Sequence, residues 1–164
     1  MTPKEKTFFE EHSKRVEATV DTLNKTLKLL DENHSEEIKE RMVEALGSEL
    51  QQLYTGFEEL GKTLLRVQNI YVKKSESHHQ MLLDLLFERI LPADDKLQTF
   101  WADLLAFRHF YRNAYGRELR PGEIVEKARE AMEFWPATKA EFSKSAKRLF
   151  QEDEVDSSPA SEKK

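Results

Sequence analysis

The sequence contains no cysteine, which excludes disulfide bonds, thiolate catalysis and cysteine metal sites. Its five glycines and five prolines leave little turn chemistry for a β-sandwich or a β-barrel. It has no run of 18 apolar residues that could span a membrane, and its polar N-terminus lacks the apolar segment of a signal peptide. We therefore expect a soluble cytoplasmic protein.

Charged residues are abundant instead. They make up 35% of the 164 residues and mix in sign along the chain, which favours long solvated helices. The hydrophobic share of 38% is enough for one modest core, and the length suits one domain. The net charge of −5 does not predict a general affinity for nucleic acid, although a local basic patch can still bind phosphate.

Two long apolar stripes predict an N-terminal helical hairpin. A capping-box pattern with proline at the first helical position opens the first helix at residues 2–5, and its apolar residues recur at helical spacing up to Leu30. After a polar break, Ser35 is placed as the N-cap of a second helix. Its stripe continues over residues 38–71 in steps of three or four, so the two helices should pair as a long antiparallel hairpin.

Four further helices are expected after the hairpin. A capping pattern at residues 77–80 precedes the first, and an acidic turn precedes the second, which spans residues 95–115 with Gly116 as its C′ residue. Two short helices follow over residues 121–135 and 138–150, the latter opened by a capping box of Thr138 and Glu141.

These segments predict an all-α fold, an up-and-down helical bundle in which residues 1–150 form a single domain. The polar tail, residues 151–164, has almost no apolar side chains to bury and is expected to be disordered.

The segment GFEELGKT, residues 56–63, has the residue spacing of a phosphate-binding P-loop. A P-loop follows a β-strand and turns its backbone amides toward phosphate, whereas this segment continues a helical stripe and adds two glutamates. We therefore reject a P-loop and interpret the small residues as a notch where another helix approaches closely. The stripe that runs through it consists of Leu53, Phe57, Leu60 and Leu64.

The histidines do not form a metal-binding pattern. His78 and His79 are adjacent, so on a helix their side chains point about 100° apart. The sequence has no pair of histidines separated by three residues, and His12 and His34 have the pattern of surface positions. We expect neither a metal ion nor a cofactor.

The stretch FRHFYRNAYG, residues 107–116, places an arginine on an apolar helical face. On a helical wheel, Arg108 falls at the centre of that face. A lone buried guanidinium is costly, so it needs a carboxylate, backbone carbonyls, or an anion brought by a site or an interface. Pairing with Asp84 or Asp103 in an ordinary core is one alternative. The other members of the face are Leu97, Trp101, Leu104, Tyr111 and Tyr115.

A local basic patch surrounds this position. Between residues 108 and 120 there are four arginines and one acid, Glu118, in a chain that is acidic overall. Such a patch suits phosphate, so we name Arg112, Arg117 and Arg120 as candidate RNA-binding residues.

The run LLAFRHFYRNAYGREL, residues 104–119, resembles the signature segment of HepT-like proteins of the HEPN superfamily, the toxins of bacterial and archaeal toxin–antitoxin pairs. The family motif of Arg, four residues, His, one residue and Tyr maps onto Arg108, Asn113 and Tyr115, and His109 fits the usual polar residue after the arginine. The segment SHHQMLLDLL is similar to a further His-x-x-Leu-Leu segment of the family. The similarity covers residues 67–150.

The resemblance implies a helical bundle that forms a homodimer, with two motif helices facing each other across a metal-independent RNA-cleaving cleft. In that cleft the arginine would stabilise the phosphate transition state and the histidine would act as general acid or base. It also implies a partner antitoxin, a nucleotidyltransferase of the MNT type, which in some systems modifies the family tyrosine with AMP. The acceptor candidate here is Tyr115.

This sequence departs from the family motif at one position, because Asn113 replaces the histidine. Asparagine can form hydrogen bonds but cannot transfer a proton near neutral pH. His109 lies one turn earlier on the same face and could substitute, since imidazole titrates in that range. Three hypotheses remain open: a ribonuclease toxin, a weak or inactive HEPN-type protein that binds RNA, nucleotide or a partner, and a structural bundle without a site.

Overall fold

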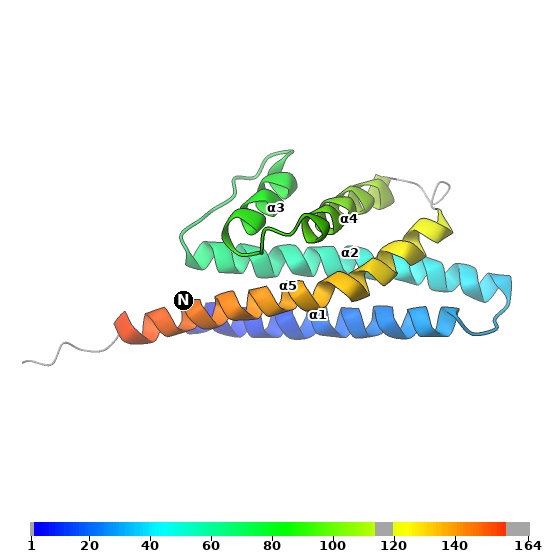
Figure 1. Cartoon of the computed structure of the whole chain (residues 1–164), viewed down its shortest axis with the longest axis horizontal. Helices are drawn as coiled ribbons and strands as arrows, with labels where there is room; N and C mark the ends of the chain where they lie inside the picture. Colours follow the sequence, from blue (N-terminus) through cyan, green and yellow to red (C-terminus); the bar gives the residue numbers. More distant parts are fainter. Residues whose placement is uncertain (1, 114–119, 157–164) are drawn as a thin grey trace, which may run out of the picture.

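The computed structural model describes residues 2–113 and 120–156, with side chains described as far as Leu149. These residues form five helices and no strand, which confirms the all-α prediction. The helices are α1 (Pro3–Leu30), α2 (Glu36–Val67), α3 (His78–Arg89), α4 (Asp95–Asn113) and α5 (Pro121–Asp156). Helices α1, α2 and α5 run side by side, and α3 and α4 form a second layer on α2 (Figure 1).

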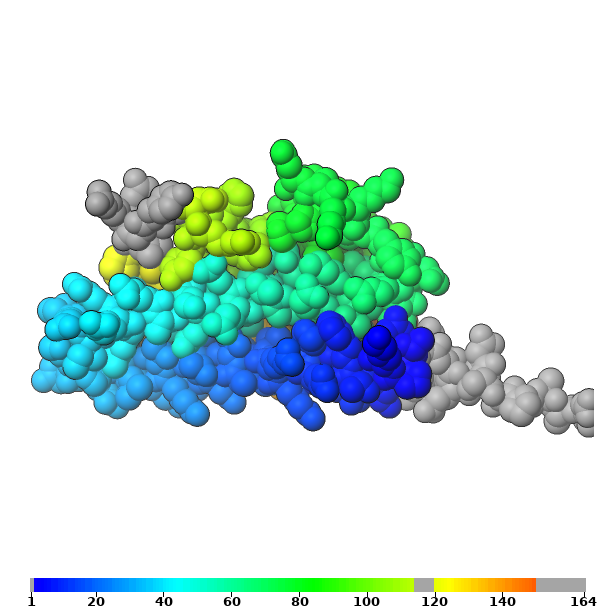
Figure 2. Space-filling model, turned by 180° about the vertical axis from the view of Figure 1, so that it is seen from behind, coloured from blue at the N-terminus to red at the C-terminus, as the bar shows by residue number. Residues whose placement is uncertain are grey.

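The predicted N-terminal hairpin is present, and its helix starts form as expected. The hydroxyl of Thr2 accepts a hydrogen bond from the backbone N–H of Glu5, and the Glu5 carboxylate accepts one from the backbone N–H of Thr2 at 2.8 Å. The hydroxyl of Ser35 accepts a hydrogen bond from the N–H of Ile38. With 32 residues, α2 is about 48 Å long. Seen from behind, α1 and α2 form one continuous surface below α3 and α4 (Figure 2).

Helix α2 ends earlier than the apolar stripe predicted. Asn69 has a φ of 59°, a left-handed conformation that asparagine tolerates better than most residues. Its N–H donates to the carbonyl of Arg66 and the N–H of Ile70 donates to the carbonyl of Leu65, both at 2.9 Å, which together form a Schellman motif. Tyr71 therefore lies beyond the helix and is 70% exposed.

Close approaches of other helices occur at glycines of α2, as the predicted notch requires. A Cβ on Gly56 would collide with Val16 of α1. A Cβ on Gly61 would lie 2.6 Å from both terminal carbons of Leu86 in α3. Both glycines are inside α2, so residues 56–63 form helix and no phosphate-binding loop.

Stacked aromatic rings join the second layer to the first. The Phe57 ring of α2 stacks on the Trp101 ring of α4 at a centroid distance of 3.7 Å, and it also stacks on Phe142 of α5 at 5.5 Å. All three side chains are buried. Such aromatic side chains bury large areas and fix the relative positions of the helices that carry them.

The prediction of two short C-terminal helices is wrong. A single helix, α5, continues through Pro136. Proline removes one backbone donor and costs a helix interior about 3 kcal/mol, but burial of Trp135 and Phe142 on either side holds the helix in place. Thr138 is not an N-cap: its hydroxyl donates to the carbonyl of Phe134 and accepts from the Trp101 indole N–H at 2.9 Å.

Two other predicted boundaries differ from the structure. The capping box at residues 77–80 does not form, because the Ser77 hydroxyl accepts no hydrogen bond from a backbone N–H at the start of α3. Its hydroxyl lies 3.4 Å from that of Ser75 instead. Helix α5 also continues to Asp156, whereas the last helix was predicted to end at residue 150.

A half-buried carboxylate on α2 gives a pH-dependent prediction. Within the described part of the chain, the Glu49 Oε2 atom is buried without a hydrogen-bond partner. Burial raises the pKa of Glu49 above 4.5, and Thr26 opposes the shift only in part. The folded protein therefore holds this proton more tightly than the unfolded chain, and the ionised form destabilises the fold at neutral pH.

We expect Glu49→Gln to raise the urea midpoint of unfolding at pH 7. The difference from wild type should shrink as the pH falls through the raised pKa of Glu49, because the wild-type carboxyl is then protonated and neutral. Denaturation curves at pH 7 and pH 4 measure this. Glu40→Gln, at an exposed position of the same helix, is the control and should change little. A lower midpoint for Glu49→Gln at pH 7 would contradict the assignment.

Candidate functional site

Arg108 lies on α4 and is half-buried against α2. Its guanidinium carbon is 5.7 Å from the centroid of the Tyr54 ring, a cation–π geometry. The ion pairs described in the chain include none to this arginine. Asp84 accepts a hydrogen bond from Gln80, and Asp103 pairs with Lys127, so neither provides the core partner considered from the sequence.

Tyr54 provides the buried platform under this arginine. Its side chain is fully buried, and its hydroxyl has no hydrogen-bond partner among the residues that the structure describes. Burial, assisted by the nearby Glu58 carboxylate, raises the pKa of Tyr54 far above its ordinary value, and Arg108 opposes this shift only in part. The hydroxyl is therefore neutral, and the positive charge of Arg108 is not compensated by a phenolate.

A carboxylate–imidazole pair lies one turn further along α2. The Glu58 side chain is only 3% exposed, and its Oε1 is 2.5 Å from Nδ1 of His79 at the start of α3. Since a carboxylate only accepts, the ring Nδ1–H donates this bond, which orients the imidazole. A buried acid with one histidine partner therefore connects α2 to α3.

The sequence interpretation missed this pair because it considered only one stripe of α2. Tyr54, Glu58, Gly61 and Leu65 form a second row beside the first, again in steps of three or four, and all four are buried. A glutamate within such a row is the signal that could have identified it, because a buried carboxylate needs a partner.

The remaining motif side chains lie on the outer face of α4. His109, Arg112 and Asn113 are exposed. The Asn113 side-chain amide donates to the His109 carbonyl at 2.8 Å, so it is turned back along its own helix. Arg120 is exposed and pairs with Glu123 at 3.0 Å. Tyr115 and Arg117 lie outside the described residues.

Tyr111 positions the motif helix against α2. Its ring lies over Gly47, where a Cβ would be 2.6 Å from the ring carbon Cε2. Its hydroxyl is 3.5 Å from the carbonyl of Glu44. The absence of a side chain at Gly47 therefore allows the end of α4 that carries Arg108 to approach α2 closely.

Comparison with known proteins now identifies the family. The family model of HepT-like proteins matches residues 45–149. The chain belongs to the HepT-like family. The match confirms the resemblance seen in the sequence and extends it back into α2, so it includes Tyr54, Glu58, His79 and Arg108. No curated protein and no solved structure matches this HepT-like chain significantly.

The described segments contain neither a membrane-spanning helix nor a cluster of metal-binding side chains. Within residues 2–113 and 120–156, no helix has the length and apolar character of a membrane span. The same residues contain no group of three histidine or acidic side chains arranged to hold a metal ion.

The contact between Gly47 and Tyr111 predicts a coupled effect on stability. Gly47→Val places side-chain atoms where the Tyr111 ring lies, so overpacking should destabilise the protein by about 1–3 kcal/mol. Tyr111→Ala removes the obstructing ring, so adding it to Gly47→Val should cost less than the sum of the two single changes. Urea denaturation of the four proteins measures the coupling, and strict additivity would show that the contact does not position α4.

The buried acid gives a second stability prediction. His79→Ala leaves the Glu58 carboxylate buried without its partner, which should destabilise the protein by about 1–3 kcal/mol. The matched control is the neighbouring His78→Ala, which should cost less because the hydrogen bond described for the His78 ring is to the nearby carbonyl of Ser75 and not to a buried carboxylate. Glu58→Gln in the His79→Ala protein should recover part of the loss. Equal effects of the two histidine variants would contradict this account.

Proposed function

We propose that this HepT-like protein is the ribonuclease toxin of a toxin–antitoxin pair, which cleaves RNA without a metal ion in a cleft between two copies of the chain. Membership of the HepT-like family supports RNA cleavage as the type of reaction. The observation that carries the proposal is the environment of Arg108, a half-buried cation that rests on an aromatic ring and lacks a carboxylate partner among the described residues. Such a cation suits an incoming phosphate.

The role of Arg108 is to bind the scissile phosphate. Charge on the non-bridging oxygens increases as the 2′-oxygen attacks phosphorus, and a guanidinium can donate two parallel hydrogen bonds to them. The contact with Tyr54 limits the orientations of the guanidinium before RNA arrives, so less reorganisation accompanies the reaction.

Proton transfer is assigned to His109. Asn113 cannot exchange a proton, and its amide is already bonded to the His109 carbonyl. The His109 imidazole is exposed next to Arg108 in sequence and would take the proton of the ribose 2′-hydroxyl as general base. The 2′-oxygen would then bond to phosphorus as the bond from phosphorus to the 5′-oxygen breaks. The 5′-oxygen would leave as a hydroxyl with a proton from the imidazolium, and a 2′,3′-cyclic phosphate would remain. Arg112 and Arg120, both exposed, would bind neighbouring phosphates, and Arg117 has the same proposed role.

The outer face of α4 is the proposed dimer contact. Phe110 is 45% exposed there, among the polar side chains of His109, Arg112 and Asn113. An exposed apolar ring beside polar side chains suits burial by a second copy. In the proposed dimer, the Arg108 residues of the two copies would lie at one cleft. The proposed antitoxin is an MNT-type nucleotidyltransferase, with Tyr115 as the residue that accepts AMP.

A second function is favoured by Asn113. If His109 does not transfer the proton, the same arginine and basic residues would still bind phosphate. The protein would then be a weak or inactive HEPN-type protein that binds RNA, nucleotide or a partner.

The test is RNA cleavage by purified protein in the presence of EDTA. We expect wild type to cleave, Arg108→Ala to lose about a hundredfold or more in rate, and His109→Ala to lose a similar factor. Arg89→Ala, at an exposed arginine of α3, is the matched control and should retain the wild-type rate. Sedimentation equilibrium should give the mass of a dimer at the assay concentration.

The outcomes separate the two functions. An inert wild type together with a cleaving Asn113→His variant would select the binding function, because only the proton-transfer group would then be missing. Absence of cleavage in every variant, or a monomer throughout, would overturn the ribonuclease proposal.

A further inference from the structure

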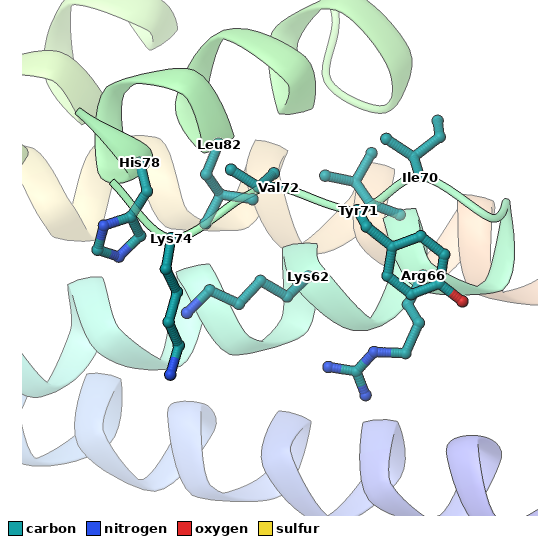
Figure 3. Close-up of a pocket in the computed structure, with 9 residues that line it drawn as sticks. Lys62, Arg66, Ile70, Tyr71, Val72, Lys74, His78 and Leu82 are labelled. Atoms are coloured by element: carbon teal, nitrogen blue, oxygen red, sulfur yellow. The ribbon is translucent and has the colours of Figure 1, made fainter. Parts of the chain in front are cut away.

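A second basic region lies away from α4, in a cavity of about 220 Å³ between the last turns of α2, residues 68–77 and the start of α3 (Figure 3). Its polar lining consists of Lys62, Arg66, Lys74 and His78. Leu65, Ile70, Val72 and Leu82 form the apolar part, and Tyr71 lies at the same cavity. Cations and apolar side chains therefore line one concave surface.

The cavity carries an excess of positive charge. Three lysine or arginine side chains line it and no carboxylate does, although the whole chain has a net charge of −5. Lys62 pairs with Glu59 at 3.0 Å. The ion pairs described in the chain include none to Arg66 or Lys74. The Glu5 carboxylate of α1, whose pKa is lowered mainly by a backbone hydrogen bond, is near enough to Arg66 for this cation to contribute to the lowered pKa. The cations at the cavity still outnumber the nearby carboxylates, which favours binding of an anion.

Lys62 of the P-loop-like segment lines this cavity with its side chain. This lysine belongs to GFEELGKT, which is helical and offers no backbone amides to a phosphate. Its side chain nevertheless extends from α2 toward the cavity, while Lys74 extends from the facing segment (Figure 3). Phosphate binding here would use side-chain charges from two segments rather than a loop of amides.

Tyr71 provides a surface for a planar group. Its ring is 70% exposed and contributes little to the core. The Schellman motif at Asn69 takes the chain out of α2 and fixes the direction in which Tyr71 leaves the helix. Exposed aromatic rings beside cationic grooves stack on nucleobases, and each stacked base contributes about 1–3 kcal/mol.

We propose that this cavity binds a nucleotide, with the phosphate on Lys62, Arg66 and Lys74 and the base on Tyr71. An inorganic anion would contact the cations but not the Tyr71 ring or the apolar side chains, and a purely apolar ligand would not pair with the cations. The ligand can be a free nucleotide or one unit of an RNA chain, because both present the same phosphate and base. The site does not include Arg108, so it does not depend on cleavage chemistry at α4.

Isothermal titration calorimetry of the full chain with 5′-UMP, uridine and inorganic phosphate tests the proposal. UMP should bind more tightly than either part alone. Arg66→Gln and Lys74→Gln should each weaken UMP binding about tenfold or more, the loss expected for one charge-assisted hydrogen bond. Tyr71→Ala should weaken binding of UMP but not of phosphate, and the exposure of this ring makes unfolding of the variant unexpected.

The matched control is Arg41→Gln, which removes the same charge from an exposed position of the same helix. It lies 25 residues before Arg66, about 37 Å along α2, and should leave UMP binding unchanged. Equal weakening by Arg41→Gln and Arg66→Gln, or no weakening by either Arg66→Gln or Lys74→Gln, would overturn the proposal. Phosphate binding as tight as UMP binding, with no effect of Tyr71→Ala, would overturn the role of the base.

A competition experiment distinguishes the two sources of the nucleotide. Displacement of UMP by a 5′-phosphorylated trinucleotide would support the proposal with RNA as the ligand, and UMP binding without displacement would support it with a free nucleotide. The calorimetry and the competition experiment measure nucleotide binding and do not depend on RNA cleavage. A failure here is therefore distinguishable from a failure of RNA cleavage at Arg108.

Discussion

Helix α2 is the element on which the rest of the structure depends, because each of the other four helices packs against it. Helices approach this closely only where side chains are small, and three glycines of α2 meet this requirement. Gly56 faces α1, Gly61 faces α3 and Gly47 faces α4. The close packing at these positions fixes where the two layers meet, and it buries α2 on two adjacent rows of residues rather than one.

This burial explains why the polar residues of α2 lie where they do. A side chain on the second row loses contact with water as soon as α3 and α4 pack, so it must find a partner on those helices. Glu58 finds His79 on α3. Tyr54 receives the guanidinium of Arg108 from α4 on its ring face. The helix that provides the core also orients the arginine of the family motif and a histidine outside that motif.

A chain with a negative net charge can still bind phosphate at a basic surface, because interactions between exposed charges in salt solution are short-ranged. Exposed counter-charges more than a Debye length away, about 8 Å in physiological salt, are largely screened. The excess of acidic residues therefore contributes little at the outer face of α4 or at the cavity beside Tyr71. In both places the cations lie next to aromatic rings, which suits a ligand with a charged part and a planar part.

The sequence by itself determined the all-α class, the N-terminal hairpin and the family, because periodicity, caps at Thr2 and Ser35, and a contiguous motif around Arg108 are local features of the chain. The tertiary structure decided what local signals could not. Pro136 was expected to end a helix, yet burial on both sides of it keeps α5 continuous. The family-like His-x-x-Leu-Leu segment includes His79, but nothing local to it indicated its partner, since Glu58 is 21 residues earlier. Among the described residues, Arg108 lies over a ring on another helix and pairs with no carboxylate, and only packing brings the arginine and the ring together.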